Sequence, residues 1–104
     1  MFKKLLGLDD DSKIRANIAN LFHRNTGTRQ QAASALRNLS NIKASNADAN
    51  RDTIREAGGI APLIASLKDS DAVVKEHAVA ALSNLSNTVT NRDAIREVCG
   101  YPSI

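Results

Sequence analysis

Apolar residues in the stretch 72–86 recur at steps of three and four residues, which is the spacing of one face of an α-helix. The apolar positions are Val74, Ala78, Ala81, Leu82 and Leu85. Asp69 and Asp71 come just before this stretch, where carboxylate oxygens can accept hydrogen bonds from the free N–H groups of a first helical turn. The pattern therefore predicts a long helix with one buried face.

A shorter stretch with the same spacing lies upstream and predicts a helix over 60–67. Its apolar positions are Ile60, Leu63, Ile64 and Leu67. Pro62 falls in the first turn, where a missing N–H costs little. Gly58 and Gly59 divide this helix from a short predicted helix at 52–57, and glycine permits the positive φ that ends a helix. One unit is thus a short helix, a glycine corner, a medium helix, a polar turn and a long helix.

Parts of this unit recur along the chain. The triplet Asn38–Ser40 returns 46 residues later as Asn84–Ser86, and the segment Arg51–Glu56 returns 41 residues later as Arg92–Glu97. The difference of five residues indicates an insertion in one surface loop, because connections tolerate insertions better than packed helices do. A period in the low forties is typical of a helical solenoid.

The repeat predicts an all-α solenoid of about two to two and a half units in 104 residues. Its predicted parts are a lead-in (1–12), a partial repeat with helices at 13–23 and 27–41 (13–41), a loop insertion (42–49), a complete repeat (50–87) and the start of a further repeat with a short helix at 90–98 (88–104).

The segment Ile54–Ile64, IREAGGIAPLI, followed by Ala78–Ser86, AVAALSNLS, resembles the armadillo repeat. The resemblance covers about 50–86, holds in part for 26–40 and 91–100, and fails over the first dozen residues. It is nearest to the armadillo regions of plant U-box ubiquitin ligases and β-catenin-like proteins, and more distant from importin alpha. HEAT repeats, which have two helices per unit and lack the Gly-Gly-Ile corner, are the alternative. The resemblance implies an armadillo-type, right-handed helical solenoid that binds proteins without catalysis and whose third helices line an inner groove.

A second stripe lies beside the buried face of each long helix, where the resemblance places this groove. Its members are Val73, His77, Ala80, Asn84 and Asn87 in one helix, and Gly27, Gln31, Ser34, Asn38 and Asn41 in the other. An asparagine amide offers a donor and an acceptor, so Asn38 and Asn84 can pair with the backbone of an extended peptide. The alternative is that each asparagine only caps the end of its own helix.

The leading interpretation is therefore a scaffold that binds a protein or extended peptide. One alternative is the armadillo part of a ubiquitin-ligase-type or nuclear-transport-type protein. Importin alpha places a tryptophan four residues before the groove asparagine, where this chain has Ser34 and Ala80, so the aromatic walls that hold lysine are missing. The groove is thus expected to favour neutral or mildly acidic segments. The other alternative is an RNA-binding repeat, which needs stacking aromatics or arginines at one position per unit.

Composition and charge limit the functions that the chain can have. The net charge of +3 is spread over mixed acids and bases, which argues against nucleic acid. Cys99 is the single cysteine, so an internal disulfide is excluded. With only two histidines, His23 and His77, the chain offers no ligand set for a structural metal. His77 has no identifiable nucleophile or orienting carboxylate, so we expect no catalysis, cofactor or small-molecule substrate. The apolar start ends at Asp9, far below the length of a membrane span, and a cytoplasmic or nuclear location is expected.

Three further expectations concern side chains outside the stripe. Cys99 takes the position of Gly58 in the unit, so a small buried side chain is predicted there. Arg51 and Arg92 begin short helices and are expected to stay solvated. No capping repeat is evident, so apolar residues at both ends should lack cover and favour self-association: Ile14, Ile18, Leu21, Ile95 and Val98.

Overall fold

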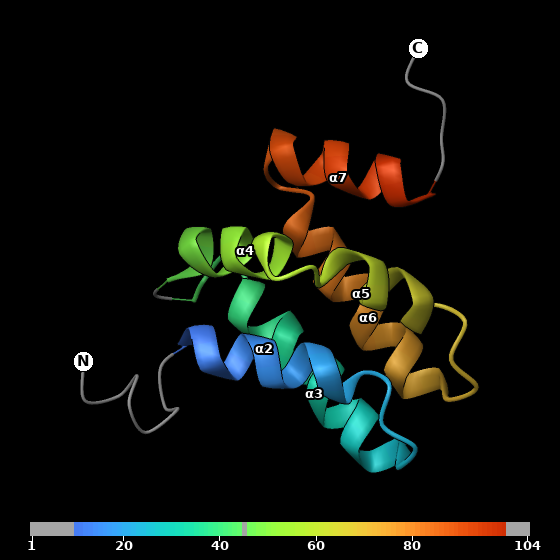
Figure 1. Ribbon diagram of the computed structural model, residues 1–104. Helices are drawn as coiled ribbons and strands as arrows, with labels where there is room; N and C mark the ends of the chain where they lie inside the picture. Colours follow the sequence, from blue (N-terminus) through green and yellow to red (C-terminus); the bar gives the residue numbers. More distant parts are fainter. Residues whose placement is uncertain (1–9, 45, 100–104) are drawn as a thin grey trace.

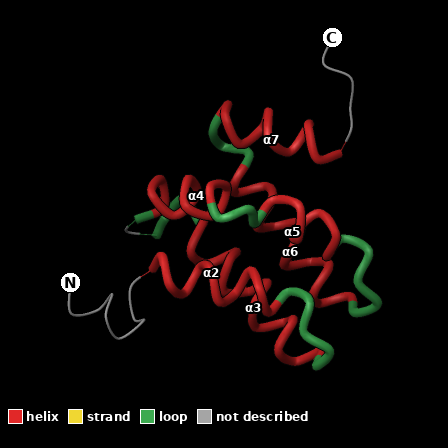
Figure 2. The backbone as a smooth tube through the Cα atoms, in the orientation of Figure 1, coloured by secondary structure: helices red, strands yellow, loops and turns green. Residues whose placement is uncertain are grey.

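The computed structural model describes residues 10–44 and 46–99, and within them the chain forms helices and turns with no strand (Figure 1, Figure 2). The helices are α2 (Asp10–Asn20), α3 (Thr26–Ser40), α4 (Ala47–Glu56), α5 (Ile60–Ser66), α6 (Ala72–Leu85) and α7 (Val89–Cys99). The predicted all-α fold is confirmed. Most of the predicted lead-in and everything from Gly100 onward lie outside the described residues.

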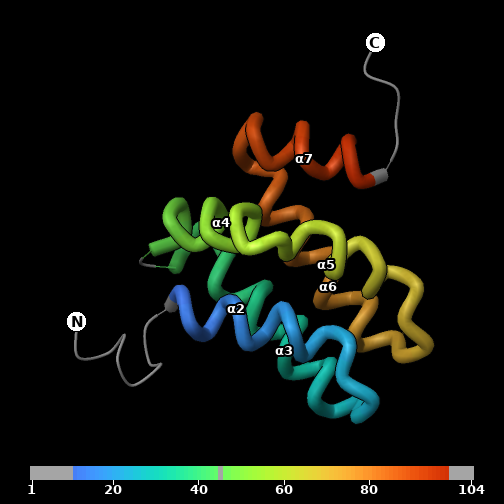
Figure 3. Tube along the Cα trace, viewed as in Figure 1, coloured from blue at the N-terminus to red at the C-terminus, as the bar shows by residue number. Residues whose placement is uncertain are grey.

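The helices stack in layers along the chain. Helices α2 and α3 form one layer, α4, α5 and α6 form the next, and α7 lies beyond them, as the path of the chain in Figure 3 shows. The main contact between layers is made by α3 and α6, and α2 also packs against α4. The second layer has three helices ending in the long one, as predicted, but α4 has 10 residues and α5 has 7, so the helix predicted to be short is longer than the one predicted to be medium.

Small side chains allow the two long helices to approach closely. Ala32 and Ala33 on α3, with Ala78 and Ala81 on α6, are each exposed by 1% or less. Larger aliphatic side chains fill the space around them, and burial of each is worth about 1.5–3 kcal/mol. The fully buried ones are Ile14, Leu36, Ile54, Leu63, Val74 and Leu85.

Leu82, which its spacing predicts to be buried, is only half-buried. The main packing partners of α6 in the described residues are α3 and α5, and no further long helix lies against the remaining face. The helical period identifies the face correctly but cannot tell whether a neighbour covers all of it.

The corner between α4 and α5 uses its two glycines differently. Gly58 has a φ of 79°, the left-handed conformation that the sequence predicts for a helix stop. Gly59 has a φ of −81°, but a Cβ there would lie 2.8 Å from Cγ2 of Ile54 and 2.9 Å from Cδ1 of Ile18. Gly58 is therefore needed for the backbone turn, and Gly59 for close contact between α2 and the corner.

Helix α4 begins at Ala47, five residues before the predicted start at 52, so the predicted loop 42–49 is shorter than expected. Contacts with the end of α3 explain the difference. Asn50 is buried and donates to the carbonyl of Leu39 at 2.9 Å, and Ala47 is 7% exposed. Both contacts hold the first turns of α4 against the preceding layer.

The expectation that Arg51 stays solvated is wrong. Its side chain is buried, donates to the carbonyl of Ser40 at 3.2 Å and pairs with Asp48. Arg92, at the matching position, is exposed but also donates to the carbonyl of Ser86, the C-cap of the preceding long helix. The recurring arginine therefore ties the start of a short helix to the end of the long helix before it.

Helix α2 also departs from its predicted bounds of 13–23, since it ends at Asn20. The N–H groups of Leu21, Phe22 and His23 each bond to a carbonyl three residues back, which closes a tight turn instead of continuing the α-helix.

The expected lack of cover at the first layer is wrong for two residues. Ile14 is 0% exposed and Leu21 is 3% exposed, because α3 and α4 pack against α2. Ile18 and Ile95 are half-buried. Val98, at the other end, is 46% exposed, as expected for an uncovered layer.

Candidate partner-binding groove

An open groove lies between α3 and α6. Its lining residues are Gln30, Gln31, Ser34, Ala35, Asn38, Val73 and His77. Five of these belong to the stripe predicted from the sequence: Gln31, Ser34, Asn38, Val73 and His77. The other five predicted members do not line it: Gly27, Asn41, Ala80, Asn84 and Asn87.

Two of the excluded asparagines serve the ends of the long helices. The backbone N–H of Asn41 donates to the carbonyl of Asn38, and the Oδ1 of Asn41 accepts from the N–H of Lys43 at 2.9 Å. Asn87 donates its side-chain amide to the carbonyl of Asn84 at 3.0 Å. Both contacts are of the local kind that ends a helix.

Asn84 instead links the two layers. Its amide nitrogen donates to the carbonyl of Arg37 at 3.0 Å and lies 3.4 Å from the hydroxyl of Ser40. Neither predicted role, a peptide ladder or a cap on its own helix, matches this contact. Asn38 holds the same position in the first unit but is exposed and makes no side-chain hydrogen bond to another described residue. The two asparagines differ because Asn84 meets α3, the long helix of the preceding layer. No long helix precedes α3 within the described residues, so Asn38 has no such partner.

Arg37 is a residue of this region that the stripe did not include. Its Nη1 lies 3.1 Å from Nδ1 of His77, which lines the groove. A guanidinium can only donate, so Nδ1 accepts this hydrogen bond. The two residues are 40 positions apart, as are Arg29 and Asp69. This separation is close to the repeat length, and it is the sequence signal from which both contacts could have been predicted.

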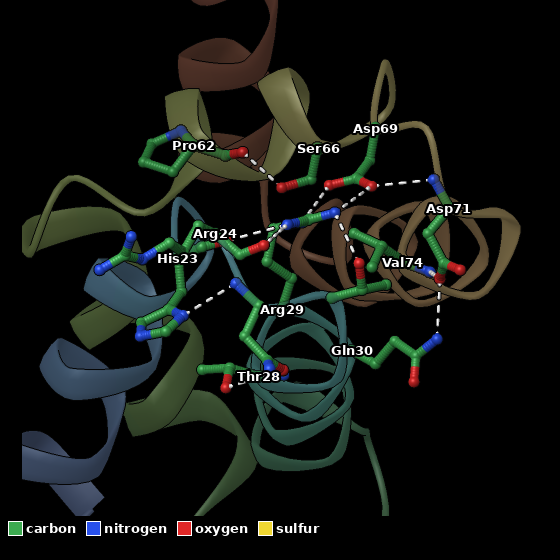
Figure 4. Close-up of polar contacts among 12 residues, drawn as sticks. His23, Arg24, Thr28, Arg29, Gln30, Pro62, Ser66, Asp69, Asp71 and Val74 are labelled. Atoms are coloured by element: carbon green, nitrogen blue, oxygen red, sulfur yellow. Dashed lines mark hydrogen bonds and ion pairs between the residues drawn. The ribbon is translucent and has the colours of Figure 1, made fainter.

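A cluster centred on Arg29 closes one end of the α3–α6 seam (Figure 4). Its Nε donates to Oδ2 of Asp69 at 2.8 Å, and its Nη1 donates to the carbonyls of His23 and Arg24 at 2.9 and 3.0 Å. The Nη2 lies 3.3 Å from the hydroxyl of Thr26 and 3.3 Å from Oδ1 of Asp69. Arg29 therefore fixes the turn before α3 against the turn before α6.

Two carboxyl groups in these turns are held in the charged form. Burial acts to raise the pKa of Asp69, but hydrogen bonds from Arg29 and from the N–H of Asp71 outweigh it, so this pKa is lowered. The pKa of Asp71 is lowered by hydrogen bonds from Gln30, at 3.0 Å, and from the N–H of Val74, also at 3.0 Å. The second bond is the predicted N-cap of α6.

Within 10–44 and 46–99, no three His, Cys, Asp or Glu side chains come together as a metal site. None of the helices in that part of the chain combines the length and apolar character needed to cross a membrane. Cys99 ends α7, and its side chain lies outside what the structure describes, so its predicted burial stays a prediction.

Comparisons with curated proteins and with solved structures gave no match. Residues 47–87 match the family model of the Armadillo/beta-catenin-like repeat. This span begins with the first residue of α4 and ends two residues after α6, so it covers the three-helix unit whose long helix forms one wall of the groove. Residues 47–87 are therefore an armadillo repeat.

Proposed function

We propose that this chain is a non-catalytic binding module whose groove between α3 and α6 takes an extended segment of a partner protein. Armadillo repeats are typically protein–protein interaction modules. The observation that carries the proposal is that long helices from two successive layers line one open groove. The nearer likeness to plant U-box or β-catenin-like regions stays a prediction.

Free amide groups on α3 suit the backbone of an extended segment. Gln31 and Asn38 are exposed, line the groove and make no side-chain hydrogen bond to another described residue. Each amide can donate to a peptide carbonyl and accept from a peptide N–H, which gives affinity with little dependence on sequence. Ser34 also lines the groove and is half-buried.

Affinity purification with mass spectrometry tests the proposal. The bait is the full chain, compared with a Gln31→Ala, Asn38→Ala double variant. A matched Ser70→Ala, Thr90→Ala variant changes two exposed polar residues away from the groove. We expect partners that the groove variant loses and the control retains. Equal recovery with all three baits would contradict groove binding.

The RNA-binding alternative has its own readout. Binding of mixed-sequence RNA that weakens steeply between about 50 and 200 mM salt would favour it over protein binding. The groove lining contains no Phe, Tyr or Trp on which a base could stack, and the imidazole of His77 is its one ring.

A further inference from the structure

Arg37 is half-buried, and its charge meets no carboxylate in the described part of the chain. Its side-chain contact there is the hydrogen bond to His77. The other arginines of similar or deeper burial, Arg29, Arg51 and Arg55, each pair with an aspartate. An anion gains more binding free energy at a partly desolvated guanidinium that has no acid beside it than at an exposed arginine.

The contact with Arg37 also determines which ring nitrogen of His77 can donate a hydrogen bond to a partner. In the neutral ring one nitrogen accepts and the other carries hydrogen. Because Nδ1 accepts from Arg37, the hydrogen of the neutral ring is on Nε2. His77 lines the groove, so this N–H is a donor available to a partner, with the charge of Arg37 on the other side of the ring.

The groove lining holds no acidic side chain that would compete for this donor. The nearest acids along α6 are Asp71, which accepts from Gln30 and from the N–H of Val74, and Glu76, which is exposed. We infer that the groove binds a carboxylate side chain of an extended partner segment at His77, with Arg37 supplying the charge behind the ring. This inference deepens the proposed function and rests on it.

Three labelled nonapeptides test the inference, alternating serine with glutamate, with glutamine or with lysine. Affinities come from fluorescence anisotropy at about 50 mM salt, where exposed charge interactions are weakly screened. The glutamate peptide should bind about fivefold more tightly than the glutamine peptide, the size expected of a partly exposed charge pair. Groove signals of Ser34, Asn38 and His77 in nuclear magnetic resonance spectra show where each peptide binds.

Two variants distinguish binding at this site from a general effect of net charge. In Arg37→Gln the preference for glutamate should fall below about twofold, while glutamine can still donate to His77. Arg24→Gln is the control, because Arg24 is exposed, has no ion pair among the described residues and does not line the groove. It removes the same charge and should keep the full preference. An equal loss in both variants would overturn the site.

The remaining outcomes distinguish the inference from the function beneath it. Glutamate and glutamine peptides that bind the groove equally, or a preference for lysine, would overturn the inference and leave groove binding in place. No groove shift with any of the three peptides would overturn both.

Nitrogen-15 shifts of the His77 ring in the unliganded chain give a test that needs no peptide, and hydrogen on Nδ1 would overturn the geometry. If Arg37→Gln fails to fold by circular dichroism, His77→Phe takes its place and should abolish the preference.

Discussion

Arg29 and Asp69 form a two-point ion pair across 40 residues of sequence, with Nε–Oδ2 and Nη2–Oδ1 distances of 2.8 and 3.3 Å. Their side chains are 15% and 10% exposed. The pair joins the first turn of α3 to the turn before α6, as Figure 4 shows. Because water has little access to it, this pair is expected to hold the two layers in register more firmly than a surface ion pair would.

Asp69→Asn should lower the free energy of unfolding by about 1–3 kcal/mol, because it weakens hydrogen bonds to a charged and poorly hydrated partner. Urea denaturation followed by circular dichroism measures the change. Asp52→Asn is the matched control, since Asp52 is 53% exposed in its pair with Arg55 and should change stability by less than about 1 kcal/mol. Equal losses in the two variants would show that the layers do not depend on the Arg29 pair.

Acid should weaken the fold through Asp69 and Asp71. Both carboxyls have a folded-state pKa below the usual 3.8, so the folded chain binds fewer protons than the unfolded chain near that pH. Their stabilisation is present above about pH 3.8 and is lost as the pH falls through the lowered values. Urea melts from pH 6 to pH 2 should show this loss. The fall should be smaller in Asp71→Asn, and an identical pH profile in that variant would contradict the assignment.

The two corner glycines should respond differently to substitution. Gly59→Ala places a Cβ under 3 Å from Ile54 and Ile18, and overpacking of this kind costs about 1–3 kcal/mol. Gly58 has open space around it but a positive φ, so Gly58→Ala should cost about 1–2 kcal/mol through backbone strain. Gly58→Asn should cost less, since asparagine tolerates that conformation. Thermal melts give the order, and no difference between Gly58→Ala and Gly58→Asn would exclude strain as the cause.

The sequence predicts the local parts of this structure well because helical spacing, the N-cap at Asp71 and the corner at Gly58 depend on neighbours along the chain. It predicts less well what depends on neighbours across layers. Asn38 and Asn84 are equivalent in the repeat, yet one is exposed and the other donates to Arg37. Arg51 is likewise buried because the end of α3 lies against it.

Asn84→Ala should lower stability by about 1–2 kcal/mol, because it removes the hydrogen bond from α6 to the carbonyl of Arg37. Leu36→Ala should cost about 2–5 kcal/mol, since Leu36 is fully buried and its loss leaves a cavity. Leu82→Ala should cost less than Leu36→Ala, because Leu82 is half-buried. Urea midpoints of the three variants provide the ranking, and Asn84→Ala that matches wild type would mean the cross-layer bond contributes nothing measurable.

Exposed valines on α6 and α7 should promote association between chains. Val79 is 57% exposed, Val89 63% and Val98 46%, and apolar surface of this kind is removed from water when it meets a second apolar surface. Sedimentation velocity from about 10 to 500 μM should show a weight-average mass that rises with concentration, a range suited to weak contacts. Val79→Lys should reduce the rise, whereas Thr90→Lys, an exposed polar position given the same charge, should reduce it less. If both lysines act equally, general charge repulsion explains the effect, and the exposed valines are not the contact.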